Sequence, residues 1–255
     1  MGFSKIMLGA LTLAAATPAL AQEETDPPSP VTISGSVGVV TDYKFRGISQ
    51  TDGNFAVQGG ITLSHESGFY ASVWGSSVDD YVTAHGTAHQ EIDLIAGFKT
   101  TSGGATFDIG ALYYVYPGTR LAGDTSSSDF VETYASIAYG IGPVTAKVGL
   151  AYAPKQKALA LNQIGPKNDN VYISGDLSAS VPNTPIGLSA HIGHTFGPSW
   201  LAIGDEYTDW SLGATYTYKA LTFGVSYVDT DGDFITPTGK NASKGAVLGS
   251  ISAAF

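Results

Sequence analysis

From Val31 to the end of the chain, apolar residues and small polar residues alternate with a period of two. In the first such segment Val31 and Ile33 lie on one parity, whereas Thr32 and Ser34 lie on the other. Successive side chains of a β-strand point to opposite faces, so the alternation predicts strands with one apolar and one polar face. The only helical candidate is the short stretch KALALNQ at 157–163.

Twelve segments of the chain show this alternation, and the connections between them are short and long in strict turn. An antiparallel meander with short turns at one end and long loops at the other is the plan of an outer-membrane β-barrel. An even number of strands places both termini at the short-turn end, which is periplasmic in that plan. The predicted strands are residues 31–43, 54–65, 69–78, 89–99, 105–116, 129–140, 144–154, 170–181, 186–196, 208–218, 221–229 and 245–255.

The two parities differ in chemistry in a way that separates a barrel from a soluble β-sandwich. The polar parity holds serine, threonine, glycine and charged residues, which suits a wet interior and not a sandwich core. The apolar parity holds aliphatic residues flanked by two groups of aromatic residues, as expected for the girdles of a membrane barrel. The group at the long-loop end is Tyr43, Phe45, Phe55, Tyr113, Tyr152, Phe196, Trp210 and Tyr227, and the group at the short-turn end is Phe69, Phe98, Phe107, Tyr139, Tyr216, Tyr218, Phe223 and Phe255.

The start of the chain predicts export. Residues 1–21 carry one lysine, Lys5, before a short apolar run that ends in small residues, which indicates a cleaved signal peptide. Residues 22–30 are acidic and proline-rich, which predicts a disordered lead-in, and residues 31–255 form the predicted barrel. The mature chain then has 11 basic and 22 acidic residues, which argues against nucleic acid as a partner. We expect a location in the outer membrane of a Gram-negative bacterium.

Several stretches carry a resemblance to a known family: VVTDYKFRGISQT, FYASVWGSSVD, EIDLIAGF, YYVYPG and WSLG. With these the chain resembles the TorF-type porin family of outer-membrane β-barrel proteins, whose members are largely of unknown function. The resemblance covers essentially the whole mature chain, and its most specific part is TDYKFRGISQT at 41–51. It implies a porin-like outer-membrane barrel, and it implies neither a substrate nor catalytic residues.

The polar parity, taken as the inward face, places charged side chains in the lumen. Seven are acidic and three are basic, so these residues either brace the wall as a polar network or form a surface that moderately favours cations. The predicted pore-lining and constriction residues are Asp42, Lys44, Arg46, Glu91, Asp93, Asp108, Glu132, Lys147, Asp176 and Asp209.

The same parity places aromatic side chains in the lumen. Twelve strands lie between the size at which side chains fill a barrel and the size that leaves a water channel, so we expect a narrow lumen. The aromatic rings either fill this lumen or form a surface along which a flat or sugar-like solute moves. They are Tyr70, Trp74, Tyr114, Tyr116, Tyr134 and Tyr172.

The stretch at 42–46 alternates charged and aromatic residues at the outer end of the first predicted strand. We expect Tyr43 and Phe45 to face lipid, and Asp42, Lys44 and Arg46 to face the mouth of the lumen. Lys44 and Arg46 then either reach toward acids across the lumen and form a charged constriction, or extend to loop water and surface anions.

These features predict a passive channel for small hydrophilic solutes, without a catalytic residue, cofactor or metal. One alternative is a barrel enzyme that modifies lipid or lipopolysaccharide, although Ser189 has the opposite parity to His194. The other alternative is a structural or adhesive barrel. The expected partners are outer-membrane lipid, a small hydrophilic solute and, through a last strand that ends on Phe255, the barrel assembly machinery.

Overall fold

The structure is a computed structural model that describes residues 30–83, 87–119, 127–161 and 166–255. The predicted signal peptide, residues 1–21, and residues 22–29 of the predicted lead-in lie outside the described residues. Within the described residues, no helix is long and apolar enough to span a membrane.

Twelve antiparallel strands close into one barrel, as the alternation predicts. The strands follow one another around the wall in chain order, and the last pairs with the first, so no barrel strand is left with an unpaired edge. Each predicted strand overlaps one observed strand. The barrel strands are β1 (Val31–Val40), β4 (Ala56–His65), β5 (Phe69–Ser77), β6 (Gln90–Ser102), β7 (Ala105–Val115), β8 (Phe130–Ile141), β9 (Val144–Gln156), β10 (Asn168–Ser180), β11 (Ile186–Phe196), β12 (Tyr207–Tyr218), β13 (Leu221–Thr230) and β14 (Ala246–Ala254).

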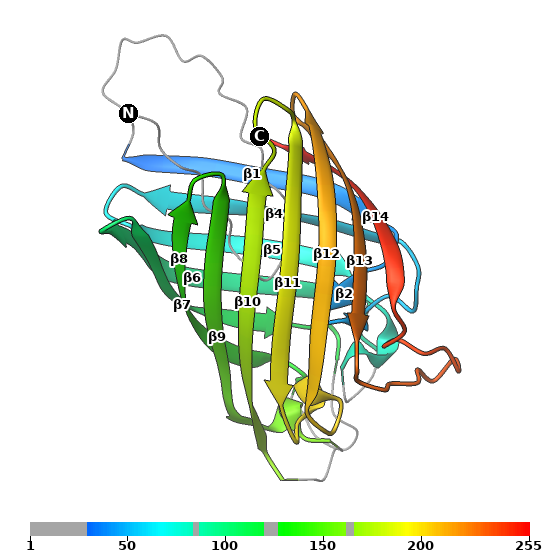
Figure 1. The fold of residues 1–255 in the computed structure, drawn as a ribbon. Coiled ribbons are helices and arrows are strands. Elements are labelled where there is room, and N and C mark those ends of the chain that lie inside the picture. The colour runs from blue at the N-terminus through cyan, green and yellow to red at the C-terminus, as the bar shows by residue number, and fades with distance from the viewer. Residues whose placement is uncertain (1–29, 84–86, 120–126, 162–165) are drawn as a thin grey trace.

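The connections are segregated by length between the two ends of the barrel. Short turns join β8 to β9, β10 to β11 and β12 to β13 at the end where the C-terminus lies (Figure 1). The long loops gather at the opposite end, and three of them contain short 3₁₀ turns: η1 (Asp80–Val82), η2 (Lys157–Leu159) and η3 (Trp200–Ala202). We call the two ends the short-turn end and the long-loop end.

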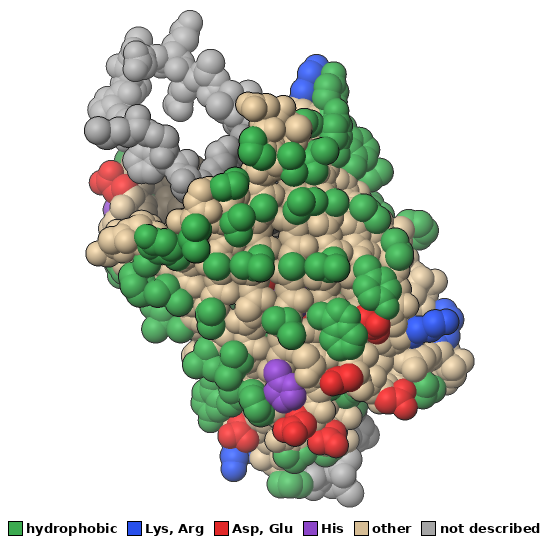
Figure 2. All heavy atoms as spheres, viewed as in Figure 1, with side chains coloured by type: hydrophobic (Ala, Val, Ile, Leu, Met, Phe, Trp, Pro, Cys, Tyr) green, Lys and Arg blue, Asp and Glu red, His purple; other side chains and the backbone are tan. Residues whose placement is uncertain are grey.

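The outer surface of the barrel is apolar, as the parity predicts. Ile33, Val57 and Ile61 are 65%, 61% and 52% exposed, whereas the neighbouring Gln58 is buried on the inner side. Rows of hydrophobic side chains run across the wall in Figure 2, and the charged side chains on that view lie mainly toward the long-loop end. The predicted outward aromatic residues are exposed at Phe55, Tyr113, Tyr152, Phe196, Tyr227, Phe69, Phe107, Tyr139, Tyr216, Tyr218, Phe223 and Phe255.

The stretch that follows β1 departs from the prediction. Strand β1 ends at Val40, and a separate two-stranded hairpin of β2 (Lys44–Phe45) and β3 (Ile48–Ser49) follows. The turn residues Arg46 and Gly47 have φ of 48° and 82°, and a two-residue hairpin turn of type I′ requires positive φ at both positions. We call residues 44–49 the lumen hairpin.

Because the chain leaves β1 and forms this hairpin, the prediction that Tyr43 and Phe45 face lipid is wrong. Tyr43 is only 5% exposed and packs edge-to-face on Trp74, at 5.6 Å between ring centroids. Phe45 packs in the same way on Tyr114 of the inner wall, at 6.2 Å. The parity of β1 cannot be extended to these residues, because the chain leaves the sheet after Val40.

Candidate functional site

The lumen hairpin crosses the inside of the barrel. It lies between β1 and β4 in the chain, and the order of the twelve strands places β8 to β10 on the opposite side of the wall. Arg46, at the tip of the hairpin, nevertheless contacts Glu132 of β8 and Asn170 of β10. The hairpin therefore spans the lumen at the long-loop end and narrows it.

Arg46 makes a dense set of contacts with the far wall. Its Nη2 donates hydrogen bonds of 2.7 and 2.8 Å to the two carboxylate oxygens of Glu132, and Nη1 donates to Asn170 Oδ1 at 3.1 Å. The guanidinium carbon lies 4.1 Å from the centre of the Tyr172 ring and 4.8 Å from that of Phe45. Both members of the ion pair are almost fully buried, so removing either would leave an uncompensated charge.

The side of the hairpin is fixed to the last long loop, between β13 and β14. Lys44 Nζ donates to the backbone carbonyls of Gly47, Ala242 and Lys244 at 3.1, 3.2 and 2.8 Å. Lys44 forms no ion pair among the described residues. It therefore does not reach across the lumen toward acids, which was one of the two predicted arrangements. Its role in the structure is to hold the hairpin against this loop.

Asp52, which follows the hairpin in the chain, also joins residues 41–55 to the loop between β13 and β14. Its carboxylate accepts hydrogen bonds from Thr236 and Thr238, at 3.0 and 2.8 Å, and lies 3.2 Å from Lys240 Nζ. Burial favours the neutral acid, but the hydrogen bonds from Thr238, Lys240 and Thr236 outweigh it and lower the pKa of Asp52. The charged form of Asp52 therefore stabilises the docked position of the segment.

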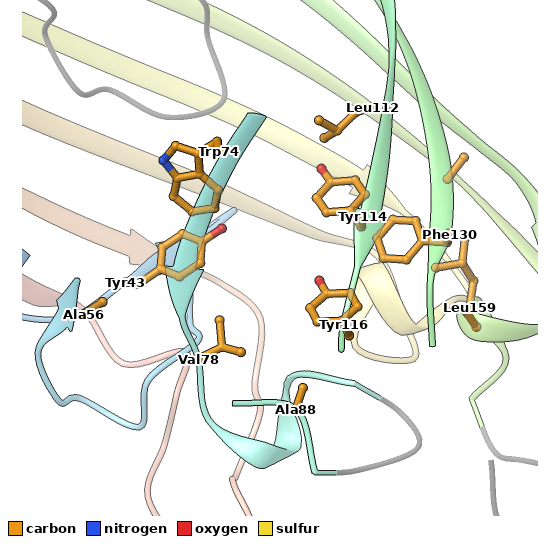
Figure 3. Packing of buried hydrophobic residues seen from close by; sticks show 12 residues of the cluster. Tyr43, Ala56, Trp74, Val78, Ala88, Leu112, Tyr114, Tyr116, Phe130 and Leu159 are labelled. Carbon is orange, nitrogen blue, oxygen red and sulfur yellow. The ribbon is translucent and has the colours of Figure 1, made fainter. Parts of the chain in front are cut away.

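Aromatic side chains pack beneath the hairpin on the wall formed by β5 to β8. Figure 3 shows Trp74 beside Tyr43, and Tyr114, Tyr116 and Phe130 grouped on the neighbouring strands. Tyr114 and Phe130 are stacked, with 4.3 Å between their ring centroids. Three of the predicted lumen aromatics, Trp74, Tyr114 and Tyr116, are therefore buried in one cluster on this wall.

The remaining predicted tyrosines lie flat along the wall. A Cβ atom at Gly193 would overlap the hydroxyl of Tyr172, and a Cβ at Gly110 would overlap that of Tyr134. The glycines therefore provide the space in which these rings lie against the neighbouring strand. Tyr70, which hydrogen bonds to Tyr134, lies over Gly97 in the same way. These rings line the wall and do not project across the lumen.

Most of the predicted inward charges have partners on the wall. Asp108 lies 3.3 Å from Lys99, Lys147 lies 3.8 Å from Asp176, and His191 contacts both Asp176 and Asp209 at 2.7 and 3.1 Å. Asp42 accepts hydrogen bonds from Ser49 and Thr51 and shapes the 41–55 segment. The structure therefore places these predicted charged residues inside the barrel, and it joins many of them in ion pairs or small networks.

Three inward residues with partners in these networks were not among the predicted site residues. Lys99 pairs with Asp108 and shares the inward parity of β6 with Glu91 and Asp93. Asn170, only 2% exposed, shares the parity of Tyr172, and His191 lies between Asp176 and Asp209. Parity alone would have placed Lys99 and Asn170 inside. The contacts of Asn170 with Arg46 depend on the turn of the hairpin, which parity does not show.

Two carboxylates of β6, Glu91 and Asp93, have no basic partner within the described part of the chain. Glu91 is 3% exposed and accepts hydrogen bonds from Tyr43 and Tyr116, at 2.8 and 2.6 Å. Asp93 is 2% exposed, and no described residue donates a hydrogen bond to its buried Oδ1. The indole nitrogen of its cross-strand neighbour Trp74 is also buried, and no described residue accepts a hydrogen bond from it.

A cavity of about 50 Å³ opens between the lumen hairpin, this wall and the long loops. Among the described residues, Glu91 is the single carboxylate in its lining, and Gln50 also contributes a polar side chain. The rest of the lining is mostly aromatic and includes Phe45, Tyr81, Tyr114, Tyr116, Phe130, Trp200, Tyr207 and Phe234.

The rival enzyme requires a serine and a histidine together on the outer face near the long-loop end. His194 Nδ1 instead contacts the hydroxyl of Thr208 at 3.0 Å, and its ring packs on Phe196. Ser189 lies five residues before His194 along β11. Its cross-strand neighbours are Ser178 of β10 and Gly213 of β12. The residues weighed for that activity are therefore not brought together.

The sequence matches a family model described as a bacterial protein of unknown function (Gcw_chp), and the match extends over residues 24–255. The chain belongs to this family. No curated protein matches this Gcw_chp protein in sequence. The family description leaves the activity open, so the function must be argued from the fold and the site.

Solved structures share the barrel at low sequence identity. The NanC porin has a TM-score of 0.58 and 9% identity to this chain, and the match covers 87% of this chain and 99% of that one. An outer membrane channel from Pseudomonas putida F1 has a TM-score of 0.53 and 10% identity, with 91% and 99% covered. The Gcw_chp protein is therefore similar in fold to outer-membrane porins and channels.

Proposed function

We propose that the protein is an outer-membrane channel through which small hydrophilic solutes diffuse passively, with a moderate preference for cations. The observation that carries this proposal is the lumen hairpin, which Arg46 joins to Glu132 across the barrel. A polar lumen narrowed by one inward segment gives the barrel a selective constriction, since charged groups at a narrow point determine which ions pass.

The polarity of the two faces supports a channel in a bilayer. The outer face is apolar, whereas the inner face carries hydroxyl groups and charges that water or other charges must satisfy. The wall tyrosines lie over glycines and leave the axis of the barrel to the hairpin. The narrowest part of the path is then determined by the hairpin rather than by the wall.

The balance of charge in the lumen supports a preference for cations. Arg46, Lys99 and Lys147 each lie beside an acid, at Glu132, Asp108 and Asp176 respectively. Glu91 and Asp93 remain without a basic partner among the described residues, and acids outnumber bases on the inward face. A cation that enters the lumen is therefore stabilised relative to an anion.

The same proposal gives the location and the partners. We place the barrel in the outer membrane of a Gram-negative bacterium with both termini in the periplasm, where outer-membrane lipid surrounds the apolar face. The assembly machinery would recognise the last strand, which ends before Phe255. The resemblance to the TorF-type porin family fits this assignment, as does the description of the two similar structures as a porin and a channel.

Conductance across a planar lipid bilayer tests the proposal. Purified protein added to one side should produce discrete current steps, and a potassium chloride gradient should give a reversal potential of the sign that indicates cation preference. Absence of steps from protein that shows a strand-type circular dichroism spectrum would contradict the channel. Release of fatty acid from outer-membrane lipid would instead support the enzyme.

A further inference from the structure

The cavity beside the lumen hairpin has the composition of a binding site for an organic cation. Its volume of about 50 Å³ holds about four water molecules, if each needs at least 10–15 Å³. Tyr114, Tyr116 and Trp200 contribute aromatic rings to the lining, and Glu91 contributes a carboxylate. The space suits a small group of about five heavy atoms.

No described basic side chain compensates the carboxylates in and next to this cavity. Each oxygen of Glu91 accepts one tyrosine hydroxyl, which leaves further acceptor capacity on a carboxylate. Asp93 lies two residues along the same inward face, between its cross-strand neighbours Trp74 and Tyr114. A carboxylate buried to this degree without a hydrogen bond or a basic partner is unfavourable unless it takes up a proton or a ligand supplies a positive charge.

We propose that Glu91 and Asp93, together with the aromatic rings around them, bind solutes that carry an ammonium group at the mouth of the channel. This inference rests on the proposed channel function and specifies the class of solute. An ammonium group is attracted to the faces of aromatic rings within about 6 Å, and the attraction grows when water is excluded. The two carboxylates provide the countercharge, and the rings provide the apolar surface for alkyl groups.

The lining distinguishes this class of solute from others. An anion would meet the carboxylate of Glu91 in the lining, and the guanidinium of Arg46 is already bonded to Glu132. A divalent metal would require three or more oxygen or nitrogen ligands together, and the described residues contain no such group of histidine and acidic side chains. A large apolar solute would leave both carboxylates buried without a partner.

Binding of tetramethylammonium to the folded barrel in detergent tests the site. The chain has three tryptophans, and Trp200 lies in the cavity lining, so its fluorescence should change saturably as tetramethylammonium chloride is added. Neopentyl alcohol, which has nearly the same shape without the charge, should bind at least about tenfold more weakly. Equal responses to the two compounds would overturn the proposal.

Two variants assign the binding to the carboxylates. Asp93→Asn has no hydrogen bond to lose and should weaken tetramethylammonium binding about tenfold, and Glu91→Gln should weaken it in the same direction. Glu206→Gln, an exposed acid in the loop between β11 and β12, is the matched control and should bind as the wild type does. Unchanged binding in Asp93→Asn and Glu91→Gln would contradict the site.

Potassium conductance of the same preparations separates this inference from the channel proposal. Discrete potassium currents without saturable tetramethylammonium binding would disprove the cation site and leave the channel. Saturable binding without any current would disprove the channel and leave the site. Both together, with a current that tetramethylammonium reduces in wild type and less in Asp93→Asn, is the expected result.

Discussion

Arg46 at the tip of the lumen hairpin donates two hydrogen bonds, of 2.7 and 2.8 Å, to Glu132 on the opposite side of the barrel. The arginine has a positive φ of 48°, a conformation that costs a residue other than glycine about 1–3 kcal/mol. The contacts of its side chain with Glu132, Asn170 and Tyr172 hold it there. The ion pair and the turn thus depend on each other.

The docking of the hairpin predicts different outcomes for substitutions at two glycines of the same segment. Gly47 and Gly53 both have positive φ, so alanine strains the backbone at either position. A Cβ at Gly47 would lie 2.9 Å from the side chains of Asp209 and Thr230, whereas a Cβ at Gly53 meets nothing within 4 Å. Gly47→Ala should therefore raise single-channel conductance by displacing the hairpin, and Gly53→Ala should leave it near the wild-type value. Equal conductance of the two variants would show that the hairpin does not limit the path.

The two faces of β4 predict a difference between adjacent residues. Ile61 faces outward and is 52% exposed, and Thr62 faces inward, where it contacts Ser72 at 2.8 Å. Arginine at the middle of an outer-membrane barrel's lipid face costs about 2–4 kcal/mol, so Ile61→Arg should impair folding into lipid vesicles. Thr62→Arg should be milder. The measurement is the fraction of protein that migrates as the folded form in unheated samples on a denaturing gel, and equal fractions would contradict the assignment of faces.

A substitution at Gly193, over which Tyr172 lies, should change single-channel conductance in the opposite direction from Gly47→Ala. Gly193→Ala should push the Tyr172 ring away from the wall and weaken its hydrogen bond to Asp209, which is 3.0 Å long. The displaced ring enters the lumen, so single-channel conductance should fall. Gly140→Ala is the control, since a Cβ there meets nothing within 4 Å. An unchanged conductance in Gly193→Ala would mean that the wall accommodates the ring elsewhere.

Asp52 predicts a dependence of the docked segment on acid pH. Its pKa is lowered in the folded protein, so it stabilises the docked state above its unfolded pKa of about 3.9, and this contribution is lost as the pH falls through the lowered value. Hydrogen exchange of residues 41–55, corrected for intrinsic rates, should show protection at pH 6 that decreases below about pH 4. Asp52→Asn should have weak protection at both pH values. Protection that persists unchanged in Asp52→Asn would contradict this role.

The alternation of polarity was sufficient to predict the twelve strands, because each strand has one apolar and one polar face. Parity also placed Glu91, Asp93 and Glu132 inside, where the structure has them. It was wrong for Tyr43 and Phe45, since it assumed that β1 continues beyond Val40. Two-residue hairpin turns are usually marked by Asn-Gly or Asp-Gly, and the Arg-Gly pair at 46–47 does not give that signal.

The contacts across the lumen could not be predicted from parity for a different reason. Parity assigns a side chain to a face, but it does not give its depth along the barrel axis or its neighbour across the lumen. The meeting of Arg46 with Glu132 depends on the stagger of the strands and on the turn of the hairpin. The position of Tyr172 over Gly193 depends on the register between β10 and β11 in the same way.

Single-channel conductance and reversal potential of Arg46→Ala test the central claim most directly. The substitution removes the side chain that spans the lumen and frees the Glu132 carboxylate, so conductance should rise and cation preference should strengthen together. Glu132→Gln, measured alongside, removes the negative charge and should weaken cation preference. If Arg46→Ala has the conductance and the reversal potential of the wild type, the lumen hairpin is not the constriction of this barrel.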